Sequence, residues 1–475
     1  MAKSVETVKK RESYNLVKEK IGNKTKNILK YIAIFVITIA IFIGALVLSS
    51  VFPRDWIQKN TEESAKIIMQ LGNPSRVLNA LFDNDTDTLM VNNAYSMDPN
   101  NLLESALLGR RNYLPEKEQT VYEDVNVETD IKPNEEYIIQ EQLIRTVNNT
   151  ITESYEYARY WHGYVTILRP LLIFFNYNEI REIMIGVLAL LAIILLMVLY
   201  KKISFKYCFV IIISLIASEY FLMGFTLQGL MTFIICMISS ILICIRYEKI
   251  KNIGIYFFVI GMVTCYFDLL THPIITLGVP MIIYLLLKQE KEQMSFKETI
   301  KFIILNTLLW GIGWGATNLA KWVIVDILYD RNLVHKSIVQ FIFRSQGSSI
   351  ENLSWYAGLQ NNWKYALKNT IEFIILLFIY VTFYVIKNYK NIKFNIKESI
   401  PYLIISLMPI AWFLVMVNHT WFHYWFTWRN LIIFYIGIGT FLLKLFSTED
   451  VDSNKTKKEV EIIQNQKGNE VKWNY

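Results

Sequence analysis

The sequence predicts an all-α integral membrane protein of about ten transmembrane helices, with a long extracytoplasmic loop after the first. Three observations support this fold class. Hydrophobic residues make up 53% of the chain and charged residues only 19%, whereas an average soluble domain carries about 25% charged residues. The apolar residues form blocks close to the roughly 20 residues that cross a hydrocarbon core about 30 Å thick. These blocks are apolar on all sides, unlike the striped helices of soluble proteins, so a soluble fold is excluded.

The first transmembrane helix is predicted at residues 28–51, after a Lys-rich cytoplasmic segment at 1–27. Because this polar segment is long and no small-residue cleavage site follows the helix, we interpret the helix as a retained signal anchor. Residues 447–475 are polar and mixed in charge, and we expect them to form a disordered cytoplasmic tail. No disulfide framework or thiolate metal site is expected, because all four cysteines lie inside apolar blocks: Cys208, Cys236, Cys244 and Cys265.

Residues 52–182 form the long extracytoplasmic loop domain. They hold 21 acidic and 12 basic residues, which gives this segment a net charge of −9. Since the net charge of the whole chain is +7, the remaining residues carry +16. A hydrophilic segment of this length is too long for a connector and is expected to fold. Within it we expect helices at 61–81 and 134–160, a turn at 83–87 and an extended segment at 117–133.

The other transmembrane helices are predicted in two groups, helices 2–7 in 183–317 and helices 8–10 in 370–446, separated by a second extracytoplasmic loop at 318–369. Lys and Arg concentrate in the short loops that a cytoplasmic N-terminus would place in the cytoplasm, which predicts that both termini are cytoplasmic. This basic charge is an orientation signal and does not indicate nucleic-acid binding. Abundant Lys, Ile and Asn suit a bacterium, so the expected location is a bacterial cytoplasmic membrane. The individual spans are expected near 28–51, 183–199, 207–224, 227–245, 253–270, 274–287, 300–318, 370–387, 400–417 and 430–446.

Carboxylates in the first extracytoplasmic loop are the candidate catalytic groups. Asp55 follows the first span, and Asp85 and Asp87 lie in the run Asp-Asn-Asp-Thr-Asp at 83–87. Carboxylates near a membrane surface can act as a general base, or can hold a divalent cation through oxygen ligands, for which Asp85 and Asp87 are possible. The alternative is that the run is only a solvated turn or a helix cap. Any further cofactor is left open.

Arginines and histidines interleaved with aromatic residues form two clusters, at 157–164 and 418–429. Such residues suit a phosphate-bearing amphiphile, because Arg binds phosphate oxygens bidentately and aromatic faces stack on sugars or line an acyl chain. The alternative is an ordinary aromatic belt with snorkelling arginines. Two histidines four residues apart can also bind zinc, but no third ligand follows at a recognisable interval. We expect both clusters to converge on one lipid phosphate through Arg159, Trp161, His162, Arg169, His419, His423 and Arg429.

The segment 266–273 lies at the extracytoplasmic junction of two predicted spans. A carboxylate charge on Asp268 has a high free energy at this depth in the membrane unless it is paired. His272 or an arginine of an outer loop is the expected partner. A tight polar turn is the alternative. Lys321 and Arg344 add positive charge from the second loop. No nucleotide-binding loop occurs, which argues against an ATP-driven pump and against a transferase that uses cytosolic nucleotide sugars.

The order of segments in this chain resembles that of the GT-C superfamily of membrane glycosyltransferases. A cytoplasmic segment is followed by one span, a long acidic loop with aspartates, and then many spans. The resemblance implies a polyprenyl-phosphate-linked sugar as donor at the outer leaflet, with an acidic residue of the first outer loop as base. That role could be carried onto Asp55, Asp85 or Asp87, and the sequence does not choose among them. Three runs also resemble segments of uncharacterised bacterial multi-pass membrane proteins: Arg159 to Gly163, Phe267 to Thr271 and His419 to Arg429. This second resemblance implies no particular activity.

The preferred expectation is therefore sugar transfer from a polyprenyl-phosphate carrier to a cell-surface glycan or lipid acceptor, with no nucleic-acid partner. The alternatives are a transporter or flippase for a lipid-linked glycan or similar amphiphile, and a non-catalytic cell-envelope assembly protein. The predicted spans are almost free of charge at mid-depth, which favours chemistry at the membrane surface over passage through it.

Overall fold

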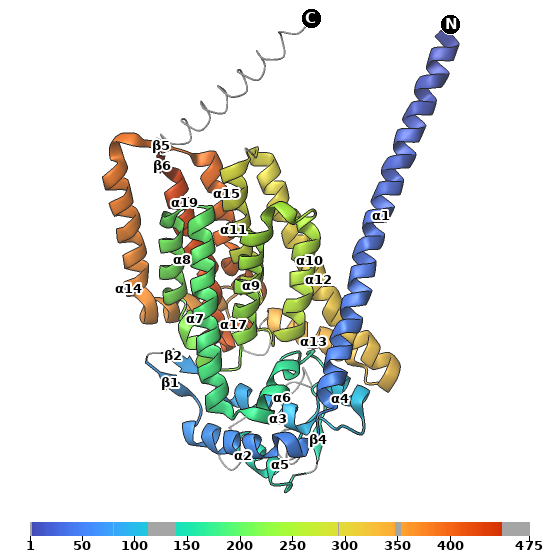
Figure 1. Cartoon of the computed structure of the whole chain (residues 1–475), viewed down its shortest axis with the longest axis vertical. Coiled ribbons are helices and arrows are strands. Elements are labelled where there is room, and N and C mark those ends of the chain that lie inside the picture. Colours follow the sequence, from blue (N-terminus) through green and yellow to red (C-terminus); the bar gives the residue numbers. More distant parts are fainter. Residues whose placement is uncertain are drawn as a thin grey trace, which may run out of the picture.

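The computed structural model in Figure 1 is a bundle of roughly parallel helices with a smaller domain of short helices and strands at one end. The long helix α1, Ala2–Ser50, runs along one side of the bundle and enters this smaller domain. We call the smaller domain the outer domain; it holds the described part of residues 54–175. The structure describes the backbone alone for residues 2–24, 346 and 448, and backbone and side chains for 25–78, 80–112, 139–151, 153–292, 294–345 and 353–447.

Among the described residues, seven helical segments are long and apolar enough to cross a membrane, which confirms the all-α membrane fold class. Three other predicted spans coincide with shorter helices, α8 at Phe205–Ala217, α10 at Ile253–Phe267 and α11 at Ile275–Lys291. Since α8 has 13 residues, it extends about 20 Å, less than the hydrocarbon thickness of about 30 Å. The count of ten therefore stays a prediction. The seven segments are Thr25–Ser50, Tyr177–Lys202, Leu230–Lys249, Phe296–Tyr329, Ala357–Asn391, Ile396–Val415 and Tyr424–Leu445.

The bundle consists of helices α7 to α19. Tyr177–Lys202 is α7, Leu230–Arg246 is α9, and 3-10 turns at Tyr220–Phe225 and Tyr247–Lys249 flank α9. Small residues let α10 and α12 pack closely, because a Cβ added at Gly261 would lie 2.2 Å from the Trp310 carbonyl oxygen. The remaining helices are α12 at Phe296–Tyr329, α13 at Leu333–Gln346, α14 at Ala357–Asn388, α15 at Ile396–Ser406, α16 at Met408–Val415, α17 at Val417–Phe422, α18 at Tyr424–Thr427 and α19 at Ile432–Leu445. Further 3-10 turns lie at Tyr389–Asn391 and Trp428–Leu431.

The outer domain combines five short helices with two small hairpin-like sheets. Its helices are α2 at Arg54–Leu71, α3 at Asn84–Ser96, α4 at Leu102–Leu108, α5 at Ile139–Val147 and α6 at Val165–Phe174. Its strands pair antiparallel, β1 at Ser75–Val77 with β2 at Ala80–Phe82, and β3 at Arg111–Asn112 with β4 at Ser154–Tyr155. A third pair, β5 at Ile392–Phe394 with β6 at Phe446–Thr448, closes the opposite end of the bundle.

Several local predictions need correction. The helix expected at 61–81 is α2, which ends at Leu71 and is followed by the β1–β2 pair. The turn expected at 83–87 is a helix start, because the Asp83 carboxylate caps α3 by accepting hydrogen bonds from the Asp85 and Thr86 amides. Of the described residues within the helix expected at 134–160, Ile139–Val147 are helical and 153–160 are not. The extended segment expected at 117–133 and the tail from 449 onward lie outside the described residues.

The predicted second loop, 318–369, is mostly helical where it is described. Helix α12 continues to Tyr329, α13 follows, and α14 starts at Ala357 and kinks at Thr370. With 34 residues, α12 extends about 51 Å and is longer than a hydrocarbon core. It therefore carries its last turns to the level of the outer domain, where Lys321 meets residues of that domain.

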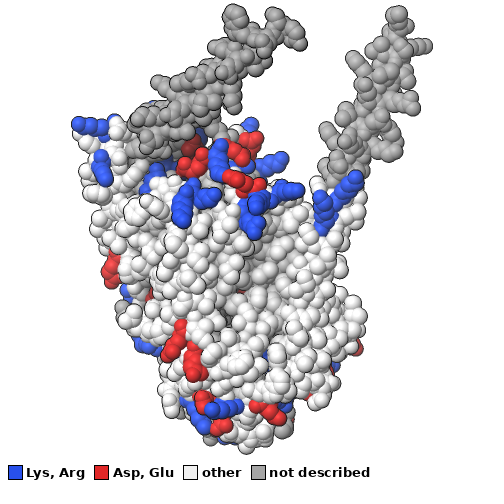
Figure 2. Space-filling model, in the orientation of Figure 1, with Lys and Arg blue, Asp and Glu red and all other residues white. Residues whose placement is uncertain are grey.

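Charge is distributed unevenly between the two ends of the bundle. Figure 2 shows Lys and Arg side chains gathered at the end opposite the outer domain, together with some acidic residues. The N-terminal end of α1 lies at this same end (Figure 1). Lys and Arg of the short predicted loops therefore gather at one end of the bundle, which is the pattern that the positive-inside rule describes for a cytoplasmic face.

Candidate functional site

The segment that joins β4 to α6 crosses the end of the bundle and carries a group of aromatic and basic side chains. We call Tyr157, Arg159, Tyr160, Lys321 and Arg344 the arginine–tyrosine site. Glycine allows the segment to lie this close to the bundle. The Gly163 amide donates to the Tyr266 carbonyl oxygen at 2.8 Å, and a Cβ on Gly163 would lie 2.4 Å from that oxygen.

Tyr160 is held by two cations from distant helices. The Lys321 ammonium of α12 donates to the Tyr160 carbonyl oxygen, and the Arg344 guanidinium of α13 donates to its phenol oxygen. Lys321 is fully buried and lies 5.7 Å from the centroid of the Trp161 ring, in a cation–π contact. Trp161 is also fully buried, and its indole Nε1 donates to the Thr317 carbonyl oxygen at 2.9 Å. Lys321 and Trp161 therefore fix the backbone of the site.

Arg159 is the site residue with the most freedom to meet a ligand. Its carbonyl oxygen accepts a hydrogen bond from Trp322 Nε1 at 2.9 Å, which anchors the backbone. Its guanidinium lies over the Tyr157 ring, 6.0 Å from the centroid, and has no hydrogen bond or ion pair with any residue that the structure describes. Burial raises the pKa of Tyr157, whereas the nearby charges of Arg159, Arg344 and Arg111 lower it. Arg159 and Arg344 thus contact two tyrosines whose ring centroids lie 5.5 Å apart.

His162 is a structural residue of this segment. Its Nε2 lies 2.6 Å from the Tyr157 carbonyl oxygen and its Nδ1 lies 3.0 Å from the Tyr164 phenol oxygen. Burial, with a smaller effect from the Lys321 charge, lowers the pKa of His162 to about 3. The imidazole is therefore neutral at physiological pH and cannot add positive charge for a phosphate.

The histidines of the second cluster reach the same region. His419 Nε2 lies 2.8 Å from the Leu270 carbonyl oxygen, and Leu270, Tyr160 and Met416 pack in one apolar cluster. The His419 and His423 ring centroids are 4.9 Å apart, and burial and the Arg344 charge lower the pKa of His423 to about 3. Zinc would need a third ligand, and the part of the chain that the structure describes has no group of three potential metal ligands.

The partner predicted for Asp268 is wrong. Its Oδ1 accepts hydrogen bonds from the Thr271 amide at 2.9 Å and from Thr271 Oγ1 at 2.5 Å, which makes the tight polar turn that was the alternative. His272 faces elsewhere, with Nε2 2.9 Å from the Phe426 carbonyl oxygen. The buried Asp268 Oδ2 has no hydrogen-bond partner among the described residues. One carboxylate oxygen of this turn is therefore buried without a side-chain partner.

Two of the predicted phosphate-binding arginines have structural partners instead. Arg169 is fully buried in α6 and donates to the carbonyl oxygens of Ala94 and Phe52. Arg429 Nη2 pairs with Glu219 Oε2 at 2.6 Å, and only 1% and 9% of these side chains are exposed. Arg159 and Arg429 share no partner among the described residues, so the structure does not place them on one common group.

The three candidate aspartates differ in their surroundings. Asp55 is exposed in the first turn of α2. Asp85 accepts hydrogen bonds from Asn73 Nδ2 and Gln140 Nε2, both at 2.6 Å, and burial raises its pKa to about 6. Asp87 is fully buried and accepts four hydrogen bonds. Asp87 is thus committed to the fold.

Sequence reasoning missed the central role of Tyr157 and Tyr160 and the proximity of Arg111. Their only signal was the density of aromatic residues around Arg159, and the pairing of distant segments has no local signature. Comparison with known proteins adds no relative: no family model, no curated protein and no solved structure matches this chain.

Proposed function

We propose that this chain is a membrane glycosyltransferase that uses a polyprenyl-phosphate-linked sugar and transfers the sugar to a glycan or lipid acceptor on the side of the outer domain. The observation that carries the proposal is the pair of guanidinium groups, Arg159 and Arg344, which lie on the adjacent rings of Tyr157 and Tyr160 at the level where the bundle meets the outer domain. A lipid-linked phosphate lies at the membrane surface, and arginines bind phosphate oxygens with geometric specificity.

In this proposal the charge on the departing carrier phosphate is stabilised by Arg159 and Arg344, which is where negative charge builds during transfer. The basic end of the bundle supports an orientation with that end in the cytoplasm and the outer domain outside. Because His162 and His423 are buried and neutral, they would position the segments 157–164 and 418–429 and would not transfer protons.

The carboxylate best placed to accept the acceptor's proton is Asp268. Leu270, two residues after Asp268, packs with Tyr160 of the site, and the Tyr266 carbonyl oxygen, two residues before it, accepts a hydrogen bond from Gly163, which follows the site in sequence. Its free Oδ2 can accept a proton while Oδ1 keeps its bonds to Thr271. Asp85, in the first turn of α3, is about 12 Å along that helix from Asn93, which neighbours Tyr164.

The first prediction concerns binding. Arg159→Ala in the purified full chain should weaken binding of undecaprenyl phosphate about tenfold or more, since charge-assisted contacts contribute about 1.5–3 kcal/mol. The matched control is Arg76→Ala, which removes an exposed arginine of the outer domain from β1. Microscale thermophoresis in detergent would measure both dissociation constants. Equal binding by Arg159→Ala and the parent chain would refute the proposed phosphate site.

The second prediction concerns catalysis. Asp268→Asn should abolish the release of polyprenyl phosphate from a panel of polyprenyl-phosphate-linked sugars and leave undecaprenyl phosphate binding intact. The asparagine oxygen can still accept from Thr271, so the turn should fold. Asp85→Asn is the matched control and should retain activity. Retained activity in Asp268→Asn with loss in Asp85→Asn would move the base to the outer-domain aspartate, and carrier binding without any sugar release by the parent chain would favour a transporter.

A further inference from the structure

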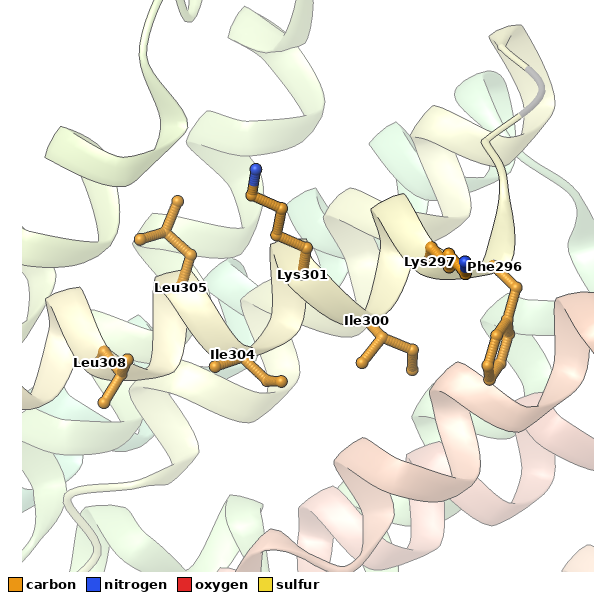
Figure 3. Close-up of a pocket in the computed structure, with 7 residues that line it drawn as sticks. All are labelled: Phe296, Lys297, Ile300, Lys301, Ile304, Leu305 and Leu308. Carbon is orange, nitrogen blue, oxygen red and sulfur yellow. The ribbon is translucent and has the colours of Figure 1, made fainter.

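The first turns of α12 carry a groove at the end of the bundle opposite the arginine–tyrosine site. It has a volume of about 500 Å³ and is open to the surroundings of the protein. Figure 3 shows its side chains arranged along one side of α12. Helix α15 contacts α12 and lies beside it. The groove is lined by Phe296, Lys297, Ile300, Lys301, Ile304, Leu305 and Leu308.

The lining is apolar except for two lysines. Ile304 is 55% exposed and Leu308 is 58% exposed, so these side chains are largely uncovered by the described residues. Lys297 lies at the end of the groove near the start of α12, and Lys301 lies one helical turn further along it. Neither ammonium group has an ion pair with a described residue. Glu298, the acidic residue between them in sequence, is instead bonded to Ser295 in the capping box of α12.

The dimensions of this surface match one leaflet of a bilayer. From Lys297 to Leu308 the helix rises by 11 residues, about 16 Å at 1.5 Å per residue. Half of a hydrocarbon core is about 15 Å thick. A chain that starts at the lysines and follows the groove therefore ends near the middle of the membrane, as an acyl chain does.

We infer that this groove binds one anionic phospholipid of the leaflet opposite the outer domain, with the phosphate between Lys297 and Lys301 and an acyl chain along Ile300, Ile304 and Leu308. Basic pockets between transmembrane helices on the cytoplasmic side bind anionic headgroups. A second copy of the chain fits less well. In a two-fold pair the same patch faces itself, which would oppose Lys297 and Lys301 to their own copies. The inference does not depend on the proposed transferase activity.

The experiment is native mass spectrometry of the full chain released from bilayers of phosphatidylcholine and phosphatidylglycerol in equal amounts. The parent chain should retain phosphatidylglycerol preferentially. The double variant Lys297→Gln/Lys301→Gln should lose most of that preference, by about twenty-fivefold if each lysine contributes roughly fivefold. Leu308→Trp, which fills the groove and keeps both charges, should also reduce retention of the intact phospholipid.

The matched control is Lys249→Gln/Lys251→Gln, two exposed lysines at the same end of the bundle that do not line the groove. It should retain phosphatidylglycerol like the parent chain. If both double variants lost the preference for phosphatidylglycerol equally, the result would show only a general attraction between the basic end of the bundle and anionic lipid. That result would overturn the proposed site. A dimer in the spectrum that Leu308→Trp dissociates would assign the groove to a second copy. Either failure would leave binding of undecaprenyl phosphate at the other end unchanged.

Discussion

Asp87→Ala is expected to destabilise the protein by about 4 kcal/mol or more, one of the largest effects of any single substitution in the outer domain. Both carboxylate oxygens are fully buried, and burial raises the pKa of Asp87 to about 6 although its four hydrogen bonds lower it. Alanine would leave the buried donors without an acceptor, at about 1–3 kcal/mol each. The donors are Tyr177 Oη at 2.6 Å and Thr226 Oγ1, the Leu227 amide and the Gln228 amide at 2.9 Å.

Asp85→Ala is the control, because it removes a carboxylate two residues away on the same helix. Asp85 is half-buried, and it accepts two hydrogen bonds instead of four, one from the exposed Asn73 amide and one from the buried Gln140 amide. Thermal unfolding of the purified chain, followed by tryptophan fluorescence, should show a much larger decrease for Asp87→Ala than for Asp85→Ala. Similar midpoints for the two variants would show that the Asp87 bonds contribute little to the fold.

The four donors to Asp87 explain why the outer domain is held in place. Tyr177 begins α7, and residues 226–228 form the connection into α9, whereas Asp87 belongs to α3 of the outer domain. A single side chain thus joins the outer domain to two helices of the bundle. Loss of activity in Asp87 variants would therefore report displacement of the outer domain rather than loss of a base.

The transmembrane helices could be predicted because hydropathy is a local property. The first predicted span coincides with α1, and each of the others coincides with one or two helices of the bundle, including the short helix α8. The second outer loop was harder to predict because Lys321 and Asp326 interrupt the apolar pattern of α12. A charged residue ends a hydropathy window but does not end a helix, and both residues find partners: Lys321 with Tyr160, and Asp326 with the Leu333 and Val334 amides.

The site was predictable only as separate clusters. Tyr157 to Tyr164, Asp268 to His272 and Asn418 to His423 were identified as unusual segments, and the structure brings them into contact. Which residues of each cluster are structural could not be predicted, because burial and long-range pairing decide it. Trp161 and Arg169 carry the residue types expected at a ligand site, yet both are fully buried and bonded to backbone carbonyl oxygens.

The pair of arginines at 159 and 429 shows how this distinction can be tested. Arg429→Ala should destabilise the chain by about 3–5 kcal/mol, because it would leave the buried Glu219 carboxylate without its cation. The guanidinium also lies 5.6 Å from the centroid of Phe82 of the outer domain, so the substitution removes a contact between the two parts of the protein. Arg159→Ala should change stability by no more than about 0.5 kcal/mol, since its guanidinium is partly exposed.

The double variant Glu219→Gln/Arg429→Gln provides the matched control for the buried pair. Two neutral amides can retain a hydrogen bond without any buried charge, so the double variant should be more stable than Arg429→Ala. The effects on undecaprenyl phosphate binding should be the reverse of the effects on stability. Binding should be weak in Arg159→Ala, which is stable, and near the parent value in the folded double variant. If the double variant folds and still loses binding as strongly as Arg159→Ala, Arg429 contacts the carrier after all, and the assignment of Arg429 to the fold alone is wrong.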